Sequence, residues 1–261
     1  MPRFAINVST LFTEYPLIER FAKAANAGFS HVEIQFPYEL NAPCIKEQLE
    51  KHSIKAILMN IPAGDWSAGD RGIACDPARV SEFRNGVHTC AKYAQILEIK
   101  QVNCLSGKLP ANVSAKTAES TLIENLRYAE SYLQRFGIKL VIEPINTVDI
   151  PEFFLHSTQQ AVDIIKACGA DSSIRVQSDI YHMQMMGENL IKTITFHQQW
   201  IAHIQVADAP GRHEPGTGNI AFNDLFTAID QMNYEGFVSF EYFPEHTTEI
   251  GLSHLAQWHL Q

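Results

Sequence analysis

Four oxygen-bearing side chains recur late in four consecutive β-rich segments of the chain. They are Glu143 in LVIEPIN, Asp179 in VQSDIYH, Gln205 in HIQVAD and Glu241 in SFEYF. In adjacent strands of a closed barrel they would meet at one rim, where three carboxylates repel each other and require a cation. Oxygen ligands favour Mg²⁺ or Mn²⁺ over zinc, which prefers nitrogen and sulfur. An alternative for Glu143 or Glu241 alone is a strand-end carboxylate that caps a helix or pairs with Arg175.

This group of residues suits proton transfer next to a carbonyl. A divalent metal polarises the carbonyl and an adjacent hydroxyl and holds the enediolate as charge develops. Glu143 and Glu241, on opposite sides, would remove and return the proton as general base and general acid. A Ser-His-Asp mechanism has no support, because no serine or cysteine lies in a recognisable nucleophile context.

Two further residues follow predicted strands closely enough to reach a substrate. His182 lies just past the sixth strand and is predicted to hydrogen-bond a substrate oxygen, with a structural histidine as the alternative. Arg212 lies in the loop DAPGRHEPGTGNI after the seventh strand, where its guanidinium can bind an anionic substrate through paired hydrogen bonds. The alternative for Arg212 is a salt bridge with Glu214 in the same loop.

The elements that carry these residues alternate regularly along the chain. The predicted strands span residues 4–9, 31–36, 55–60, 101–106, 139–146, 174–181, 201–208 and 237–243, and the predicted helices span 15–27, 78–97, 115–135, 159–167, 189–198 and 223–232. Eight such repeats predict an α/β fold, a single (β/α)8 TIM barrel over residues 1–261. An open doubly wound sheet is the alternative, disfavoured because no G-x-G-x-x-G follows the first strand.

Alternation within the strands predicts a polar barrel interior. The inward-facing polar positions are His31, Glu33 and Gln35 in the second strand, Arg175, Gln177 and Asp179 in the sixth, and His203 and Gln205 in the seventh. The opposite face of each strand is apolar and can pack on helices. Buried charge is unfavourable unless it is paired or bound to metal, so this interior indicates a functional site.

One predicted strand-to-helix connection, residues 61–77, is unusually long. Loops of this length are usually binding loops or lids, and in a barrel this loop lies on the face where active sites form; a tolerated insertion is the alternative. Arg71 in this loop and Lys108 in the next are predicted to bind substrate at the rim, with a solvated charge as the alternative for each.

Composition narrows the class of protein. The 261 residues include 20 Lys and Arg against 29 Asp and Glu, a formal net charge of −9, which disfavours nucleic-acid binding. Five cysteines without metal-site spacing predict reduced thiols. We expect a cytoplasmic protein without a membrane partner, because a strand-like run begins at once, leaving no room for a signal peptide, and no apolar stretch approaches the roughly 18–20 residues of a membrane helix.

Six stretches of the sequence are specific enough to compare with known families. They are NIPAGDWSAGDRGIAC, LIENLRYAE, IEPINTVDIPEFFL, DIYHMQ, HIQVAD and HEPGTGNI. With them the chain resembles, from end to end, the hydroxypyruvate isomerase family of the xylose-isomerase-like TIM barrel superfamily. The resemblance implies a divalent metal held by Glu143, Asp179, Gln205 and Glu241, with Glu143 and Glu241 as proton donor and acceptor. In related ketose epimerases, residues placed like His182 and Arg212 contact the substrate.

The implied reaction is the aldose–ketose type isomerisation of hydroxypyruvate to tartronate semialdehyde. It rearranges a small hydroxy-keto acid without net oxidation, so neither nicotinamide nor flavin is needed. Arg71 is the first candidate to meet the substrate carboxylate. The sequence departs from close relatives at Ser178, where tyrosine is expected, whereas Gln205 in place of the histidine of many superfamily members is the pattern of this isomerase family.

Several related functions compete with this interpretation. A 2-oxo-tetronate isomerase would use the same metal and carboxylates on a longer acid, although NIPAGDW and RGIAC favour hydroxypyruvate. A related sugar epimerase is a further alternative. An AP endonuclease would need several metals, histidine ligands and a basic groove, which Gln205 and the charge of −9 argue against. A non-catalytic sugar-acid-binding barrel conflicts with the Glu143/Glu241 pair. A homo-oligomer is compatible with the sequence.

Overall fold

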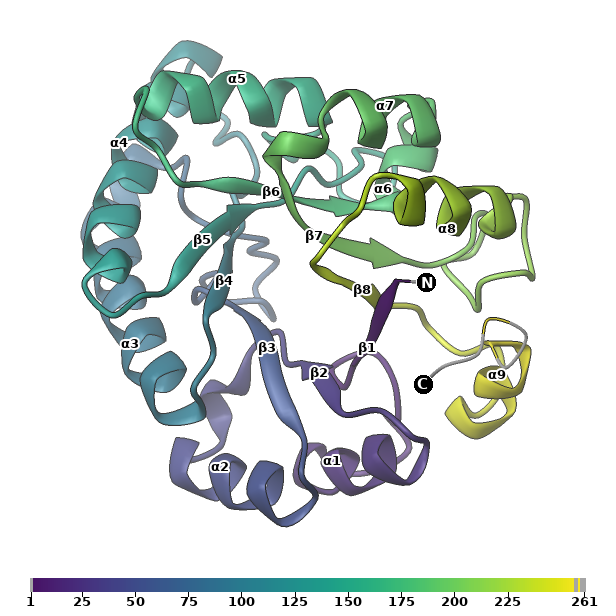
Figure 1. Cartoon of the computed structure of the whole chain (residues 1–261). Coiled ribbons are helices and arrows are strands. Elements are labelled where there is room, and N and C mark those ends of the chain that lie inside the picture. The colour runs from purple at the N-terminus through teal and green to yellow at the C-terminus, as the bar shows by residue number, and fades with distance from the viewer. Residues whose placement is uncertain (1, 256–257, 259–261) are drawn as a thin grey trace.

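A computed structural model of the protein describes residues 2–255 and 258. Within them, eight parallel strands close into a barrel, in which each strand pairs with the next and β8 pairs with β1 (Figure 1). The strands are β1 (Arg3–Asn7), β2 (His31–Glu33), β3 (Lys55–Asn60), β4 (Gln101–Cys104), β5 (Lys139–Ile142), β6 (Arg175–Asp179), β7 (Ile201–Val206) and β8 (Phe237–Phe240). The predicted (β/α)8 barrel is confirmed.

Helices surround the barrel and cover the apolar face of its strands (Figure 1). They are α1 (Leu17–Asn26), α2 (Ala42–Lys51), α3 (Val80–Leu97), α4 (Ala115–Gln134), α5 (Thr158–Cys168), α6 (Ile180–Met185), α7 (Leu190–Phe196), α8 (Phe222–Gln231) and α9 (Thr248–Leu255). In α4, Leu122, Leu126 and Leu133 lie on the buried face at helical spacing. Among the described residues, no helix is long and apolar enough to span a membrane.

The sequence patterns predict no helix at α2, α6 or α9. The apolar stripe of α2 is sparse, because only Ala42, Ile45 and Leu49 are buried. The strand predicted over residues 174–181 ends at Asp179 instead, since its side chain accepts hydrogen bonds from the backbone N–H groups of Tyr181 and His182 and thereby caps α6.

The barrel interior is polar, as the alternation within the strands predicts. The fully or almost fully buried polar side chains contributed by strands include Asn7, Glu33, Asn103, Gln177, Asp179, His203 and Gln205. Because the strands are parallel, their carboxyl ends all open on the same face of the barrel. That face is where the predicted ligands lie.

Candidate active site

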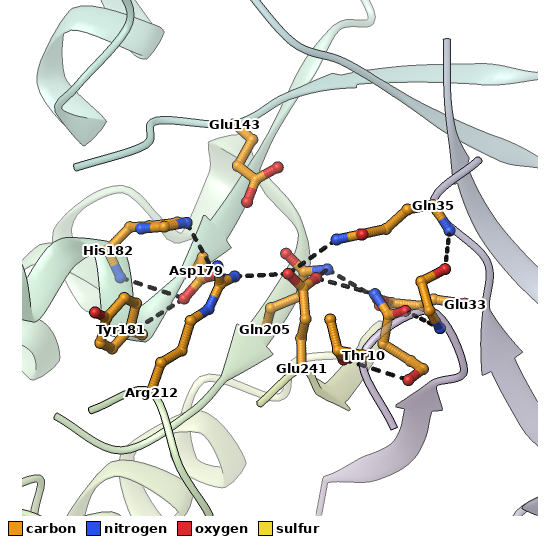
Figure 2. Close-up of polar contacts among 12 residues, drawn as sticks. Thr10, Glu33, Gln35, Glu143, Asp179, Tyr181, His182, Gln205, Arg212 and Glu241 are labelled. Atoms are coloured by element: carbon orange, nitrogen blue, oxygen red, sulfur yellow. Dashed lines mark hydrogen bonds and ion pairs between the residues drawn. The ribbon is translucent and has the colours of Figure 1, made fainter. Parts of the chain in front are cut away.

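The carboxyl ends of four neighbouring strands bring the four predicted ligands together. Asp179 is the last residue of β6 and Gln205 lies near the end of β7. Glu143 and Glu241 directly follow β5 and β8, so the predicted strands 139–146 and 237–243 are a few residues too long. All four side chains are buried, with Glu143 the most accessible at 5% exposed. Figure 2 shows their polar groups directed toward a common centre.

Arg212 supplies a positive charge inside this cluster. Its Nη2 atom lies 2.6 Å from Oε1 of Glu241 and 3.2 Å from Oδ2 of Asp179 (Figure 2). The predicted alternative partner, Glu214, instead accepts hydrogen bonds from the backbone N–H of Glu245. Arg212 therefore binds two carboxylates of the site instead of a residue of its own loop.

The loop that carries Arg212 is folded around one buried aspartate. Oδ2 of Asp208 accepts hydrogen bonds of 2.8 Å from the backbone N–H groups of Gly216 and Gly218. Its Oδ1 accepts from the N–H groups of Ala209 and Ile220 at 2.8 and 3.1 Å. Glycine is needed at position 218, because a Cβ there would lie 2.4 Å from the carbonyl oxygen of Ala209. Asp208 thus fixes both ends of the Arg212 loop.

Burial changes the protonation of the site residues. It raises the pKa of Glu143 well above its usual value, and the charges of Glu241 and Asp179 raise it further. Burial likewise raises the pKa of Asp179, and it raises the pKa of Glu241 to about 8 despite the opposing charge of Arg212. Burial and Arg212 lower the pKa of His182 well below its usual value. One guanidinium therefore does not offset three buried carboxylates, and a further cation would stabilise their ionised forms.

Amide side chains orient the two predicted proton-transfer carboxylates. Nδ2 of Asn103 donates to Oε2 of Glu143 at 2.7 Å. Nδ2 of Asn7 donates to Oε2 of Glu241, and Nε2 of Gln35 donates to Oε1 of the same carboxylate, both at 3.0 Å. Hydrogen bonds to both oxygens hold the Glu241 carboxylate in one orientation.

A buried pair lies beside Gln205 in the barrel interior. Nε2 of His203 contacts Oε1 of Glu33, and Oε2 of Glu33 accepts a 2.8 Å hydrogen bond from Nε2 of Gln205. Nε2 of Gln205 also contacts Glu241, whereas its Oε1 accepts a 2.6 Å hydrogen bond from Nε2 of Gln177. These contacts leave Oε1 of Gln177 buried without a partner.

The donor groups fit a divalent cation. Carboxylate oxygens of Glu143 and Asp179 and a ring nitrogen of His182 all lie within 4.8 Å of one another, so the two carboxylates are close enough to share one metal ion with His182 beside it. Gln205 directs its Nε2 at Glu33 and Glu241 and its oxygen at Gln177, so it gives an oxygen to this centre only if its amide reverses. The residues therefore suit a hard cation among buried carboxylates.

The remaining predicted cations lie outside this cluster. The guanidinium of Arg71 donates to the carbonyl oxygens of Trp66 and Asp70 at 3.1 and 2.6 Å and stacks on the Trp66 ring. Lys108 is exposed, and its backbone pairs with Phe153. Arg175 donates to backbone carbonyls at the start of β6, so the alternative that it pairs with Glu143 or Glu241 is wrong.

Sequence reasoning assigned no role to the residues that orient the carboxylates. Gln35 belongs to the polar alternation of the second strand, which identifies its face but not its partner. Asn7 and Asn103 interrupt otherwise apolar segments, FAINVS and QVNCLS, and a buried amide in such a strand is the signal that identifies them. The hydrogen bond between Asn146 and His182 joins a loop to a helix and has no sequence signal.

The closed parallel barrel with its site at the strand ends defines the class of the protein. A sequence model described as xylose isomerase-like TIM barrel matches residues 21–258. The chain belongs to this family.

Comparison with individual proteins narrows this class. The chain is 48% identical to hydroxypyruvate isomerase of Escherichia coli K12 over 252 residues, 97% of either chain. It is 36% identical to 2-oxo-tetronate isomerase of Cupriavidus necator over 255 residues, 98% of either chain. A crystal structure from Brucella melitensis, described as an AP endonuclease of family 2, superposes with a TM-score of 0.95 at 39% identity and 99% coverage of both chains. The resemblance to hydroxypyruvate isomerases that the motifs predict is confirmed.

Proposed function

We propose that the chain is an isomerase that interconverts hydroxypyruvate and tartronate semialdehyde. The observation that carries the proposal is the pair of buried carboxylates, Glu143 and Glu241, each held by amide donors at the mouth of the barrel. The 48% identity to an isomerase of this name, over nearly the whole chain, supports the same substrate.

The reaction moves one proton between neighbouring carbon atoms. One carboxylate of the Glu143/Glu241 pair takes a proton from the hydroxymethyl carbon, and the other delivers a proton to the former carbonyl carbon. The hydroxyl proton moves to the neighbouring oxygen, so an enediol lies between ketone and aldehyde and no electron acceptor is required. Burial raises the pKa of both carboxyl groups and a bound cation would lower it again, which brings the pKa toward the range for proton exchange near neutral pH.

A divalent cation completes the proposal. Glu143, Asp179, Gln205 and Glu241 would hold Mg²⁺ or Mn²⁺, which when bound supplies polarisation of the substrate carbonyl and compensation of the carboxylate charge. Arg212 and His182 would contact substrate oxygens, and Arg71 and Lys108 remain predictions as partners of the substrate carboxylate. A single-domain chain, a cytoplasmic location and assembly into a homo-oligomer also remain predictions.

A second candidate is 2-oxo-tetronate isomerase, supported by the relative that is 36% identical. NMR in D₂O with Mg²⁺ or Mn²⁺, running hydroxypyruvate and 2-oxo-tetronate side by side, separates the two. We expect faster conversion of hydroxypyruvate, its loss on adding EDTA, and deuterium on the product carbon that receives the proton. Preference for the longer acid would favour the second candidate, and turnover of neither would contradict both.

Because the similar structure from Brucella melitensis is described as an AP endonuclease, the experiment includes a test for DNA cleavage. An oligonucleotide with an abasic site, incubated under the same metal conditions, tests for strand cleavage. We expect none, because a chain of net charge −9 repels the phosphate backbone. Cleavage abolished by Glu143→Gln would assign the endonuclease activity to this site.

A further inference from the structure

The loop after β5 contains a buried asparagine whose hydrogen-bonding capacity is completely used. Oδ1 of Asn146 accepts from the backbone N–H groups of Val148 and Asp149 at 3.0 and 2.7 Å. A backbone N–H only donates, so the atom facing these two groups must be the oxygen of the amide. The orientation of the Asn146 side chain is therefore fixed by the main chain of its own loop.

The other end of that amide faces the imidazole of His182. Nδ2 of Asn146 lies 2.6 Å from Nδ1 of His182 and 3.0 Å from Oδ2 of Asp149, which also accepts from the hydroxyl of Tyr181 at 2.8 Å. An amide nitrogen only donates, so Nδ1 of His182 must accept and carries no proton. In a neutral imidazole the single proton then resides on Nε2.

The protonated nitrogen points into the site. Nε2 of His182 lies 3.6 Å from Oδ2 of Asp179, longer than a hydrogen bond, on the side where Glu143 and Asp179 converge (Figure 2). A nitrogen that holds a proton has no lone pair to offer a metal or to accept a substrate proton. It is able to donate its hydrogen to an oxygen atom that enters the site.

We propose that Asn146 is a positioning residue that fixes His182 as the Nε2–H tautomer, so that His182 donates a hydrogen bond to a substrate oxygen and serves neither as metal ligand nor as base. The inference rests on the proposed function only for its kinetic consequence. The tautomer itself follows from the contacts of Asn146.

The tautomer is measurable without turnover. In protein labelled with ¹⁵N-histidine and kept in Mg²⁺, long-range ¹H–¹⁵N correlation distinguishes a protonated from an unprotonated ring nitrogen, and His182→Gln identifies the signal by its disappearance. We expect a protonated Nε2 and an unprotonated Nδ1 in the unaltered protein. A protonated Nδ1 of His182 in the unaltered protein would overturn the inference.

Asn146→Asp provides the matched reversal. It is combined with Asp149→Asn, because Oδ2 of Asp149 lies 3.0 Å from Nδ2 of Asn146 and two facing carboxylates would repel each other. The new carboxylate keeps an acceptor for the two backbone N–H groups but presents a second acceptor to His182, which moves the ring proton to Nδ1. We expect Nδ1 of His182 to become the protonated nitrogen and Nε2 the unprotonated one. We also expect kcat to fall by about 10–100-fold, the range typical for partners that orient site residues. Asp149→Asn is the control, because it alters the neighbour of Asn146 and leaves the donor to His182 in place.

Each outcome decides the inference. If the tautomer of His182 is unchanged when Asn146 is replaced by Asp, Asn146 does not determine it. If the tautomer switches but kcat is unchanged, His182 does not act as the hydrogen-bond donor to the substrate. If the unaltered protein converted neither acid, the proposed function would fail, and the spectrum would still decide the tautomer.

Discussion

Glu143 and Glu241 occupy equivalent positions, each one residue beyond the end of its strand, and each receives amide hydrogen bonds. Both residues lie at the mouth of the barrel and are almost fully buried, at 5% and 3% exposed. This combination raises the pKa of both groups while fixing where their oxygens point. Proton transfer to and from carbon needs both properties in the same groups.

Replacing either carboxylate by its amide is expected to impair proton transfer and to weaken metal binding, with little change of shape. We predict that Glu143→Gln and Glu241→Gln each lower kcat for hydroxypyruvate by about 10²–10⁴-fold, the usual contribution of a general acid or base. Steady-state rates and deuterium incorporation measure the effect. Glu124→Gln, on the exposed side of α4, is the control and should behave as the unaltered protein. Full activity in either site variant would exclude that residue from proton transfer.

At the level of single residues, the places of the four predicted ligands at neighbouring strand ends were predictable from the sequence, whereas the hydrogen-bond partners of these residues were not. Asp179 and Gln205 lie at the polar positions of alternating strands, and in a barrel of parallel strands all the carboxyl ends open on one face. The partner of Arg212 depended on the path of its loop, which local sequence does not determine. Asn146 meets His182 only after β5, β6 and α6 have packed, so the contact cannot be read from either segment alone.

The elements position the site through their ends. The sequence identified all eight strands of the described barrel because they alternate with long amphipathic helices, but it placed several strand ends too late. One cause of this error is that local alternation can continue past the point where a side chain ends the strand. At Asp179 the end is a helix cap, which converts a predicted strand residue into the first turn of α6.

The loop after β7 provides a prediction about one element. Asp208→Asn replaces one acceptor oxygen by a donor beside backbone N–H groups, so at least one buried N–H loses its partner, at about 1–3 kcal/mol for each such group. We expect a lower Tm and faster hydrogen exchange at Gly216 and Gly218, with weaker substrate binding because Arg212 loses its support. Asp171→Asn, at an exposed position, is the control. Unchanged exchange at both glycines would show that Asp208 does not hold the loop.

The first turn of α4 provides a second prediction about a single element. The Ser114 hydroxyl accepts a 3.1 Å hydrogen bond from the backbone N–H of Thr117 and caps the helix. Ser114→Ala should reduce the free energy of unfolding by about 1 kcal/mol, measurable in urea. Ser120→Ala, exposed within the same helix, should not destabilise, since alanine is the better helix former. Equal loss in both variants would assign the effect to helix propensity instead of the cap.

Over the whole molecule, charge is divided between the two ends of the barrel. The acidic residues of the site lie at the carboxyl ends of the strands, whereas Arg3, Lys55, Lys139 and Arg175 are the first residues of theirs. These cations line a cavity of about 1390 Å³ at the opposite mouth. The helices run antiparallel to the strands, so their negative carboxyl-terminal ends lie near these cations and are stabilised by them.

Thiol reactivity tests how completely the barrel excludes solvent. Cys44 is exposed, whereas Cys75, Cys90, Cys104 and Cys168 are buried. Burial raises the pKa of the Cys75 and Cys90 thiols to about 12, which suppresses the reactive thiolate. We predict that a disulfide reagent such as DTNB titrates one thiol quickly in the native protein and all five in denaturant. Cys44→Ser should remove the fast phase, and a fast phase that persists would show that a buried thiol is reached.

The pairing of β8 with β1 joins the two ends of the chain and closes the barrel. The residues of the site likewise come from both halves of the chain. All four predicted metal ligands belong to the half from β5 onward, while Asn7, Gln35 and Asn103, which aim the two glutamates, belong to the half before it. A chain divided between β4 and β5 would leave the ligands on one fragment and the residues that orient them on the other. A substitution in either half of the chain can therefore change the chemistry of the complete site.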